Sequence, residues 1–481
     1  MSDPARRSVI EAFGIVGAAQ LLIRIRGVLL IPILARGLGA HDYGVWVLVV
    51  STVGLVSVVT MLGMPQALER FLAGTTRRDD QREDFLSSLA LAGLATVLVV
   101  LPAVVGARAW AVAAFHDEAV APLIRAGAWI LLATAVNQIV LMFFRSQREM
   151  RAMSALDLLT GLGELVLSAL AVRAGYGLDG ALLALLVARG ATAVIALGLI
   201  VARVGIGVPR LRHTRKYLAF GVPTVLMGLT YWVVETSDRY FVGFYGTPTQ
   251  VGIYSAAYAL GGVLVFLRLP FMLVLPPFVY QLWDRQDYHT AARYLDASLR
   301  SYLIVAVPMA FGIGILATAA LTVLAGREFA AQGGPVVPIV VAAMFCYGLS
   351  GITGLVFWLQ KKSRELSTLW LLAAACNPVL NVLLIPRLGI VGAAVATLVC
   401  YAIPTVPCVV VYLRLVGRGP DVPFLSATFA GSLLMAALVR LLNPSGMGGL
   451  AVAVALGAGA YLGALLLMGG RRFFSFGGRP A

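Results

Sequence analysis

Apolar runs of about 20 residues recur along the whole chain and constrain its fold more than any other feature. A bilayer core of about 30 Å requires roughly 20 apolar residues per helix. We therefore predict about fourteen membrane helices, beginning near residues 9, 43, 84, 119, 154, 178, 216, 250, 299, 335, 365, 390, 423 and 447. Of the 481 residues, 60% are hydrophobic and only 12% are charged, about half the charged share of a soluble domain. The sequence predicts an all-α polytopic membrane protein.

Positive charge is distributed unevenly between alternate connections. One set of connections, together with both termini, carries 25 Lys and Arg residues, whereas the opposite set carries six. The richer set comprises the N-terminus, 70–82, 145–151, 203–216, 285–300, 361–364, 414–418 and the C-terminal tail. By the positive-inside rule, both termini are predicted to be cytoplasmic. The net charge of +15 is therefore a topology signal, and we predict no nucleic-acid partner.

Several short patterns in the first half return in the second half at a nearly constant offset of about 210 residues. The stretch "ILARGLGAHDYGVWVLV" has a looser copy in "FVGFYGTPTQVGIYSAA", "SQREMRAMS" in "LQKKSRELS", and "GLDGA" in "GIVGA". Any one match also arises by chance among Gly-rich turns, but three in the same order favour duplication. The sequence predicts two six-helix lobes, 9–203 and 216–417, and two additional transmembrane helices in 423–469.

Two features of this repeat bear on transport. An even number of helices returns the chain to the same side, so the lobes form a parallel pseudo-two-fold repeat, an arrangement found in transporters that handle substrate between the two halves. The Gly-rich stretches are predicted to form tight outer turns. Trp46 and Tyr254, which follow these turns, are then expected near the outer membrane interface, where amphipathic rings prefer to lie.

Ionisable residues inside membrane helices are costly and mark candidate functional sites. Glu164 and Arg189 both fall about 15 Å into the membrane core at 1.5 Å per residue. They are expected either to pair as a structural salt bridge or to serve transport. Glu235 and Arg239 are four residues apart, so that each can neutralise the other on one helix face. Asp238 is the third mid-span acid.

The remaining candidates are arginines. Arg24 and Arg26 point about 200° apart around the first helix, so both cannot easily line one cavity. No acidic residue lies one helical turn from either arginine. We therefore predict that their partner is a residue of another helix or an anionic ligand, and we favour the ligand. Arg268 is placed inside the eighth helix. Arg70, in "ALERF", lies at the inner end of the second helix and is either a cavity residue or an inner-surface charge.

The sequence lacks the common signatures of catalysis. It contains no GxxxxGK[ST], HExxH or GxSxG motif, and its four cysteines have no metal-binding spacing. We therefore predict no enzyme activity, no catalytic residue, no cofactor and no metal site. A polytopic membrane glycosyltransferase or polymerase would usually need a sizeable outer loop with acidic residues, and the outer loops are short.

The run Arg26-Gly27, "IPILARGLGAHDYG", Gly63, Ala67 and Arg70-Phe71, with "DRYFVGFYGTPTQVGIYSAAYAL" in the second half, resembles a known family. It is similar to the polysaccharide flippases of the multidrug/oligosaccharidyl-lipid/polysaccharide exporter superfamily. The resemblance covers roughly residues 9–417. It implies two six-helix lobes around a central cavity, with alternating access, in the bacterial inner membrane. The implied substrate is an undecaprenyl-pyrophosphate-linked oligosaccharide for O-antigen, exopolysaccharide or capsule synthesis.

The resemblance also implies a cavity lined with basic side chains, which fall here on Arg24 or Arg26, Arg70, Arg239 and Arg268. Arginine matches phosphate oxygens with a planar fork and stays ionised. Relatives couple transport to H⁺, Na⁺ or the membrane potential, and the acids available here are Glu164, Glu235 and Asp238. The expected partners are thus the lipid-linked oligosaccharide, membrane lipids and a coupling ion.

Two other classes of transporter compete with the flippase interpretation. A cation-coupled multidrug antiporter of the same superfamily would share the fold but should favour acids over arginines in its cavity. A fourteen-helix major facilitator should carry Gly-x-x-x-Asp-Arg/Lys-x-Gly-Arg after its second helix, and "ERFLAGTTRRDDQRED" does not match. The flippase interpretation is favoured.

Overall fold

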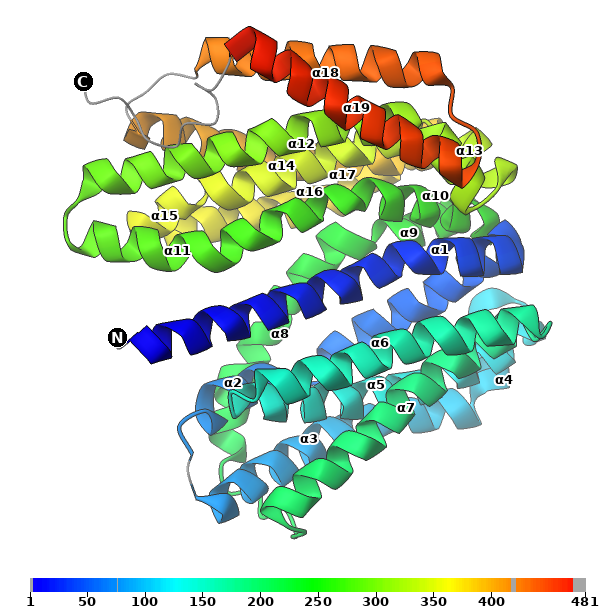
Figure 1. Ribbon diagram of the computed structural model, residues 1–481. Helices are drawn as coiled ribbons and strands as arrows, with labels where there is room; N and C mark the ends of the chain where they lie inside the picture. Colours follow the sequence, from blue (N-terminus) through cyan, green and yellow to red (C-terminus); the bar gives the residue numbers. More distant parts are fainter. Residues whose placement is uncertain (1–2, 76, 417–420, 470–481) are drawn as a thin grey trace. The chain divides into compact units, whose positions relative to one another are not determined.

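The computed structural model describes the backbone of residues 3–75, 77–416 and 421–469 as helices and short connections (Figure 1). Side chains of residues 3–28, 114–115 and 469 lie outside this description. The described residues form no strand. The α-helices are α1 (Asp3–Thr60), α2 (Met64–Leu72), α3 (Arg78–Val105), α4 (Ala107–Trp110), α5 (Ala121–Ser146), α6 (Met150–Arg173), α7 (Gly177–Val204), α8 (Thr214–Thr236), α9 (Asp238–Tyr245), α10 (Pro248–Gly261), α11 (Arg268–Asp284), α12 (Tyr288–Leu324), α13 (Arg327–Gly333), α14 (Val336–Thr353), α15 (Leu355–Leu359), α16 (Ser363–Leu388), α17 (Ile390–Val416), α18 (Val422–Leu442) and α19 (Gly446–Gly469).

Thirteen helical segments of the described chain are long and apolar enough to cross a membrane. The difference from the expected fourteen lies in α1. This helix runs through the first Gly-rich stretch, broken only at Gly39 with φ 79° and ψ 173°. The break divides α1 into two helical stretches, so the first two expected helices both lie within it. The all-helical, multi-pass fold predicted from the sequence is confirmed.

The second copy of the Gly-rich stretch has a different local structure. Here α9 ends at Tyr245 and α10 begins at Pro248, whose missing amide hydrogen is tolerated in a first turn. The Thr247 hydroxyl accepts a hydrogen bond from the main-chain N–H of Gln250. The side-chain oxygen of Gln250 in turn accepts from the main-chain N–H of Thr247, and both distances are 3.3 Å. This capping box satisfies two end donors of α10 and fixes its start.

The chain divides into two compact units, residues 1–232 and 233–481. In unit 1, α1 packs against α5, α6 and α7, and α5 packs against α3. Its core includes an aromatic cluster in which the Phe143 ring lies 5.1 Å from Phe85 and 5.8 Å from Phe144. Interdigitated rings of this kind fix how α3 sits on α5.

Unit 2 is built around α14 and α17, with α16 packed on α17 and α12 on α14. The last two helices, α18 and α19, pack on each other and on α12, as Figure 1 shows. Tyr461 of α19 donates to the main-chain oxygen of Ile304 in α12 at 2.7 Å. The additional helices expected in 423–469 are therefore part of the second unit.

The division between the units falls inside α8 and not in the connection 203–216. The beginning of α8 packs closely on unit 1, where a Cβ on Gly63 would lie 2.1 Å from the main-chain oxygen of Gly221. Gly63 has φ 68°, so both its conformation and its surroundings require glycine. The six-helix lobes 9–203 and 216–417 and their parallel repeat stay a prediction.

Two pairs of turns related by the sequence repeat share a backbone conformation. Arg148 and Lys361, 213 residues apart, both have left-handed φ, at 61° and 58°. In each turn the amide of the next residue donates to a phenylalanine carbonyl five residues back, at 2.9 and 2.7 Å. Gly177 and Gly389 likewise have φ of 54° and 58°. The matched segments thus end and begin their helices in the same way.

Candidate functional site

A buried polar cluster surrounds Asp238, the first residue of α9 in unit 2. The side chain is 0% exposed. One carboxylate oxygen, Oδ2, accepts hydrogen bonds from Tyr254 Oη at 2.7 Å and Thr397 Oγ1 at 2.5 Å. The other, Oδ1, accepts from Nδ2 of Asn377 at 3.3 Å and of Asn381 at 3.1 Å. Four neutral donors from α10, α16 and α17 therefore converge on one carboxyl group.

The two asparagines are held in place by their own contacts. They lie four residues apart on α16, on one face of the helix, and both are fully buried. Asn381 Nδ2 donates to Asn377 Oδ1 at 2.9 Å, and the Ser237 hydroxyl lies within hydrogen-bond distance of the same oxygen, at 2.9 Å, and of the Val233 main-chain oxygen, at 2.6 Å. Asn381 Oδ1 is buried and has no hydrogen-bond partner among the described residues. The cluster therefore retains a free oxygen acceptor.

The charge of Asp238 is not balanced by a basic side chain, because none of the ion pairs found among the described residues includes it. Its four donors are neutral, and a buried charge is otherwise normally paired. The Thr397 hydroxyl lies within hydrogen-bond distance of both Asp238 and the main-chain oxygen of Ala393, at 2.5 and 3.1 Å. A hydroxyl has one hydrogen and cannot donate to both acceptors. Thr397 therefore donates to one of these two oxygens at a time.

Glu235 and Arg239 do not pair in the way that their spacing suggests. Arg239 donates from Nη1 to the main-chain oxygen of Glu235 at 3.0 Å, and its guanidinium carbon lies 5.0 Å from the Tyr258 ring centre. The Glu235 carboxylate accepts from Tyr401 Oη at 3.4 Å. The backbone stays helical at Ser237, between α8 and α9, with φ −61° and ψ −27°, so the two side chains differ in their partners and not because the backbone turns away.

Arg268 begins α11 and lies flat against an aromatic ring. Its guanidinium carbon is 4.2 Å from the ring centre of Tyr347, a close cation–π contact. Gly351 leaves room for it, since a Cβ there would lie 2.3 Å from Arg268 Nε. That Nε is buried and has no hydrogen-bond partner among the described residues. The guanidinium is thus positioned by stacking and retains donors for a ligand.

A set of three aromatic rings links these charged groups. The ring centre of Tyr347 lies 5.0 Å from that of Tyr401 and 5.9 Å from that of Trp370. Arg268 lies over Tyr347, and Tyr401 contacts Glu235, so cation, rings and acid form one continuous group. The structure therefore brings Glu235, Asp238, Arg239 and Arg268 into one region of unit 2.

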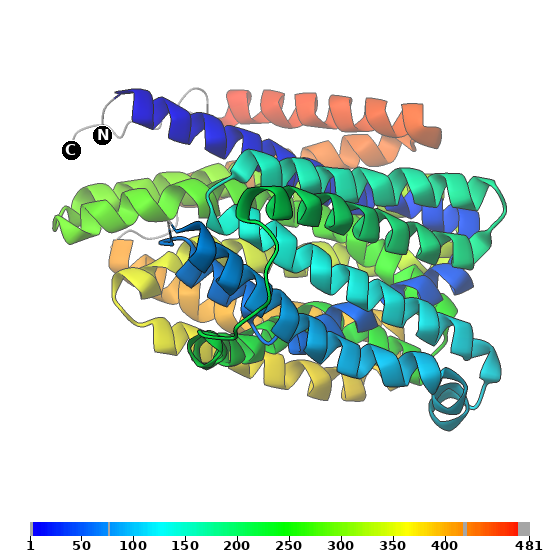
Figure 2. The same cartoon turned by 90° about the horizontal axis from the view of Figure 1, so that it is seen from below.

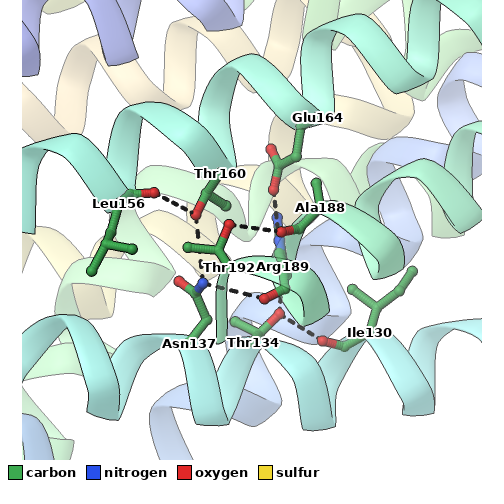
Figure 3. A network of polar contacts seen from close by, with 9 residues as sticks. All are labelled: Ile130, Thr134, Asn137, Leu156, Thr160, Glu164, Ala188, Arg189 and Thr192. Carbon is green, nitrogen blue, oxygen red and sulfur yellow. Dashed lines mark hydrogen bonds and ion pairs between the residues drawn. The ribbon is translucent and has the colours of Figure 1, made fainter. Parts of the chain in front are cut away.

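Glu164 belongs to a separate polar network in unit 1, shown in Figure 3. Arg189 Nε on α7 donates to Glu164 Oε1 on α6 at 2.8 Å, and Arg189 Nη1 donates to Thr134 Oγ1 on α5 at 2.7 Å. Asn137 Nδ2 reaches the Arg189 main-chain oxygen at 3.4 Å and Thr160 Oγ1 at 3.5 Å. The depths of Glu164 and Arg189 allowed an ion pair, and the structure shows it; a role of Glu164 in transport stays a prediction.

The other three predicted arginines, Arg24, Arg26 and Arg70, lie in unit 1. Arg70 is exposed in the last turn of α2, next to Glu69, which pairs with Arg145 at 3.0 Å. Arg24 and Arg26 lie in the first stretch of α1, and their side chains are outside the described residues. Which of them faces a ligand stays a prediction.

Unit 1 also has a small cavity of about 130 Å³ between α1, α2, α5 and α8, with a lining that is more apolar than polar. Its lining includes Gln66 and Gln138, both exposed, and Ser57. The Ser57 hydroxyl is buried without a hydrogen-bond partner among the described residues. The lining side chains are uncharged, which suits hydroxyl-bearing ligands such as sugars.

Several residues of this site were not predicted from the sequence. Asn377 and Asn381 carried a usable signal, because two amides four residues apart in an apolar helix must share a face. Tyr347 and Tyr401 gave no sequence signal of this kind, because aromatic residues are common in membrane helices. Tyr254 was expected near the outer interface, and its depth stays a prediction; its contact with Asp238 was not predicted, although its ring is fully buried and its hydroxyl donates to that carboxylate.

Comparison with known proteins places the chain in a family. Residues 9–283, more than half of the chain, match the family model described as "polysaccharide biosynthesis protein". The chain belongs to this family. It is 23% identical to the "probable low-salt glycan biosynthesis flippase Agl15" of Haloferax volcanii, over 78% of this chain and 77% of that protein. It is also 27% identical to the "probable flippase AglR" of the same organism, over 43% and 44%. The resemblance inferred from the sequence is confirmed.

Solved structures show the same fold. The "lipid II flippase MurJ, inward closed conformation" matches with a TM-score of 0.74 at 14% identity, over 94% of this chain and 98% of that one. An inward-facing multidrug resistance transporter of the MATE family matches with a TM-score of 0.65 at 14% identity, over 82% and 94%. At these identities the likeness defines the fold and not the substrate.

Proposed function

We propose that the protein is a flippase that moves undecaprenyl-pyrophosphate-linked oligosaccharides across the bacterial inner membrane by alternating access. Family membership and the names of the relatives Agl15 and MurJ support this class of substrate. The product would enter O-antigen, exopolysaccharide or capsule synthesis. The observation that carries the proposal is Arg268, a half-buried cation in a membrane protein whose Nε lacks a partner among the described residues.

In this proposal Arg268 and Arg239 bind the pyrophosphate. Both guanidinium groups are held against tyrosine rings, which orients them without using a carboxylate that would compete with phosphate. Bidentate arginine–phosphate contacts are stronger than neutral hydrogen bonds. We propose Arg70 and either Arg24 or Arg26 as further substrate-binding residues, all of them in unit 1, and the cavity at Gln66 and Gln138 as a contact for sugar hydroxyls.

Among the three acids, Asp238 is the best candidate for ion coupling. Glu164 has Arg189 as an internal counter-charge, and Glu235 is held by Tyr401. Asp238 has only neutral donors, together with the free oxygen of Asn381 nearby. A buried carboxyl of this kind can take a proton, or a Na⁺ ion coordinated by the surrounding oxygens. Binding and release of that cation on the two sides of the membrane would drive the transport cycle.

A reconstituted flipping assay tests the proposal. The substrate is an undecaprenyl-pyrophosphate-linked oligosaccharide with a fluorescent label on its sugar, and external dithionite bleaches only the outer leaflet. We expect Arg268→Gln and Arg239→Gln to slow the second bleaching phase by about tenfold or more, because charged hydrogen bonds are lost. Arg268→Lys should retain part of the rate because it keeps the charge.

The matched control is Arg440→Gln, which removes an exposed arginine from the end of α18. It should flip at the wild-type rate. Equal rates in the wild type, Arg268→Gln and Arg239→Gln would refute the basic site.

A cation-coupled multidrug antiporter is the alternative, and the buried Asp238 is the observation that favours it. The same liposomes loaded with ethidium decide between the two. Ethidium transport that depends on Asp238, with no flipping of the labelled lipid, would replace the flippase assignment.

The orientation of the chain is also a proposal, supported by the excess of Lys and Arg in alternate connections. With cytoplasmic termini, a membrane-impermeant thiol reagent applied to intact cells should label a cysteine at position 247 and leave one at position 215 unlabelled. The reverse pattern would invert the topology.

A further inference from the structure

A polar pocket of about 370 Å³ lies at the end of unit 1 where the connection between α7 and α8 meets α2 and α3. Arg77, Arg212 and Lys216 line it, together with His213 and the Tyr217 ring. This volume is in the range of small-molecule sites and exceeds that of a single ion. None of these residues belongs to the substrate or coupling site proposed above.

The connection that supplies Arg212 and His213 is fixed to α3 by its main chain. The Glu83 carboxylate accepts from the Arg210 amide at 2.9 and 3.0 Å and from the Arg212 amide at 3.4 Å. The Ser87 hydroxyl accepts from the Leu211 amide at 3.2 Å. In Figure 2 this connection is a non-helical green coil beside the blue segment with α2 and α3. The basic side chains are therefore presented from a fixed loop.

The two acids in the pocket face basic partners. His213 Nδ1 lies 2.7 Å from Asp84 Oδ1, and Asp84 is buried. Asp80 lies 3.9 Å from Arg77. Three fixed cations thus face two carboxylates, and Arg212 has no ion-pair partner among the described residues. The pocket keeps an excess of positive charge.

Two further groups point to an anionic ligand. The Tyr217 side chain is 3% exposed, and its hydroxyl lies beside the Asp84 carboxylate at the wall of the pocket. Lys216 Nζ lies 4.2 Å from the Phe71 ring centre, which holds the ammonium group at the pocket without neutralising it. Arg212 and Lys216 can donate to phosphate oxygens, and the Tyr217 hydroxyl can add a third donor.

The position of the pocket favours a phosphate ester. It lies at the beginning of α3 and α8, two of the segments that are apolar enough to cross a membrane. The ends of such segments reach the headgroup layer, where basic side chains attract anionic lipids. We propose that this pocket binds the phosphate group of an anionic ligand, either a phospholipid headgroup or a soluble phosphate.

The test uses the full-length protein. To measure lipid binding, the protein is exchanged into phosphatidylcholine nanodiscs doped with phosphatidylglycerol, and the retained lipids are identified by native mass spectrometry. Titration calorimetry with inorganic phosphate at constant ionic strength measures binding of a soluble phosphate. Retention of phosphatidylglycerol over phosphatidylcholine identifies a lipid site, and phosphate binding alone identifies a soluble ligand. Binding of neither probe overturns the proposal.

Two double variants distinguish a specific phosphate site from a nonspecific effect of positive charge. Arg212→Gln combined with Lys216→Gln should weaken binding by about tenfold or more, because two charged hydrogen bonds are lost. Arg210→Gln combined with Arg215→Gln removes two exposed arginines that do not line the pocket, and should bind as the wild type does. Equal losses in both double variants would overturn the site. Tyr217→Phe should bind more weakly with an unchanged unfolding temperature; unchanged binding would exclude a role for the hydroxyl.

Discussion

Arg189 Nε donates to Glu164 Oε1 across 2.8 Å, and the Glu164 side chain is 4% exposed. The same guanidinium also binds Thr134, so three helices of unit 1 meet at one arginine. Asp238 in unit 2 is also a buried carboxylate, but its donors are four neutral groups. One acid therefore has an arginine as its partner, whereas the hydrogen-bond partners of the other are neutral.

Removing one partner of the Glu164–Arg189 ion pair should destabilise the protein. We expect Arg189→Gln to lower the free energy of unfolding by roughly 3 kcal/mol, because it leaves Glu164 charged and unpaired. Glu164→Gln combined with Arg189→Gln should recover most of this loss. Thermal unfolding in detergent measures both, with the exposed Glu328→Gln as control. A single variant as stable as this control would contradict the prediction.

Asp238→Asn should abolish ion coupling while preserving the fold. The amide oxygen can still accept from Asn377 and Asn381, and the amide nitrogen can donate to the two hydroxyls, which rotate. Flipping by the variant should no longer respond to an imposed proton or Na⁺ gradient. Asp238→Ala should misfold, because the Tyr254 hydroxyl and the Asn377 side-chain amide lose their acceptor, each costing about 1–3 kcal/mol. A response of the Asn variant equal to that of wild type would move coupling to another acid.

Gly351→Ala should disable Arg268 without mutating it. The added methyl group would lie 2.3 Å from Arg268 Nε and force the guanidinium away from the Tyr347 ring. We expect the flipping rate to fall by about tenfold, as for loss of a charged hydrogen bond. Gly262→Ala is the control, since its Cβ would meet nothing within 4 Å. Equal rates in the two variants would show that stacking on Tyr347 does not matter.

The first turn of α12 should be sensitive to acid. The Thr290 amide donates to the Asp287 side chain at 3.1 Å, and this hydrogen bond lowers the pKa of Asp287 below its ordinary value. A lowered folded-state pKa means that the cap stabilises the helix above the unfolded-state pKa and is lost as the pH falls through the folded-state pKa. Asp287→Asn should remove this pH dependence. Hydrogen exchange of residues 288–291 measures it; identical acid profiles in both proteins would contradict it.

The sequence by itself determined which segments are helical and which family the chain belongs to. Helices expected to begin near residues 365, 390 and 447 begin at Ser363, Ile390 and Gly446. The matched turns at Arg148 and Lys361 share one backbone conformation. These properties are local, because a run of apolar residues and a turn are specified by neighbours along the chain. The depth argument for Glu164 and Arg189 succeeded for the same reason.

Only the tertiary structure decided which polar side chains meet. Asp238 binds Tyr254, 16 residues away, and Thr397, 159 residues away. Helical periodicity says which residues share a face, but in a membrane protein both lipid and protein faces are apolar, so the pattern does not tell which face meets which helix. Arg239 contacts the Tyr258 ring and the main-chain oxygen of Glu235, and Arg268 lies over a ring of another helix. Those contacts come from packing between distant helices.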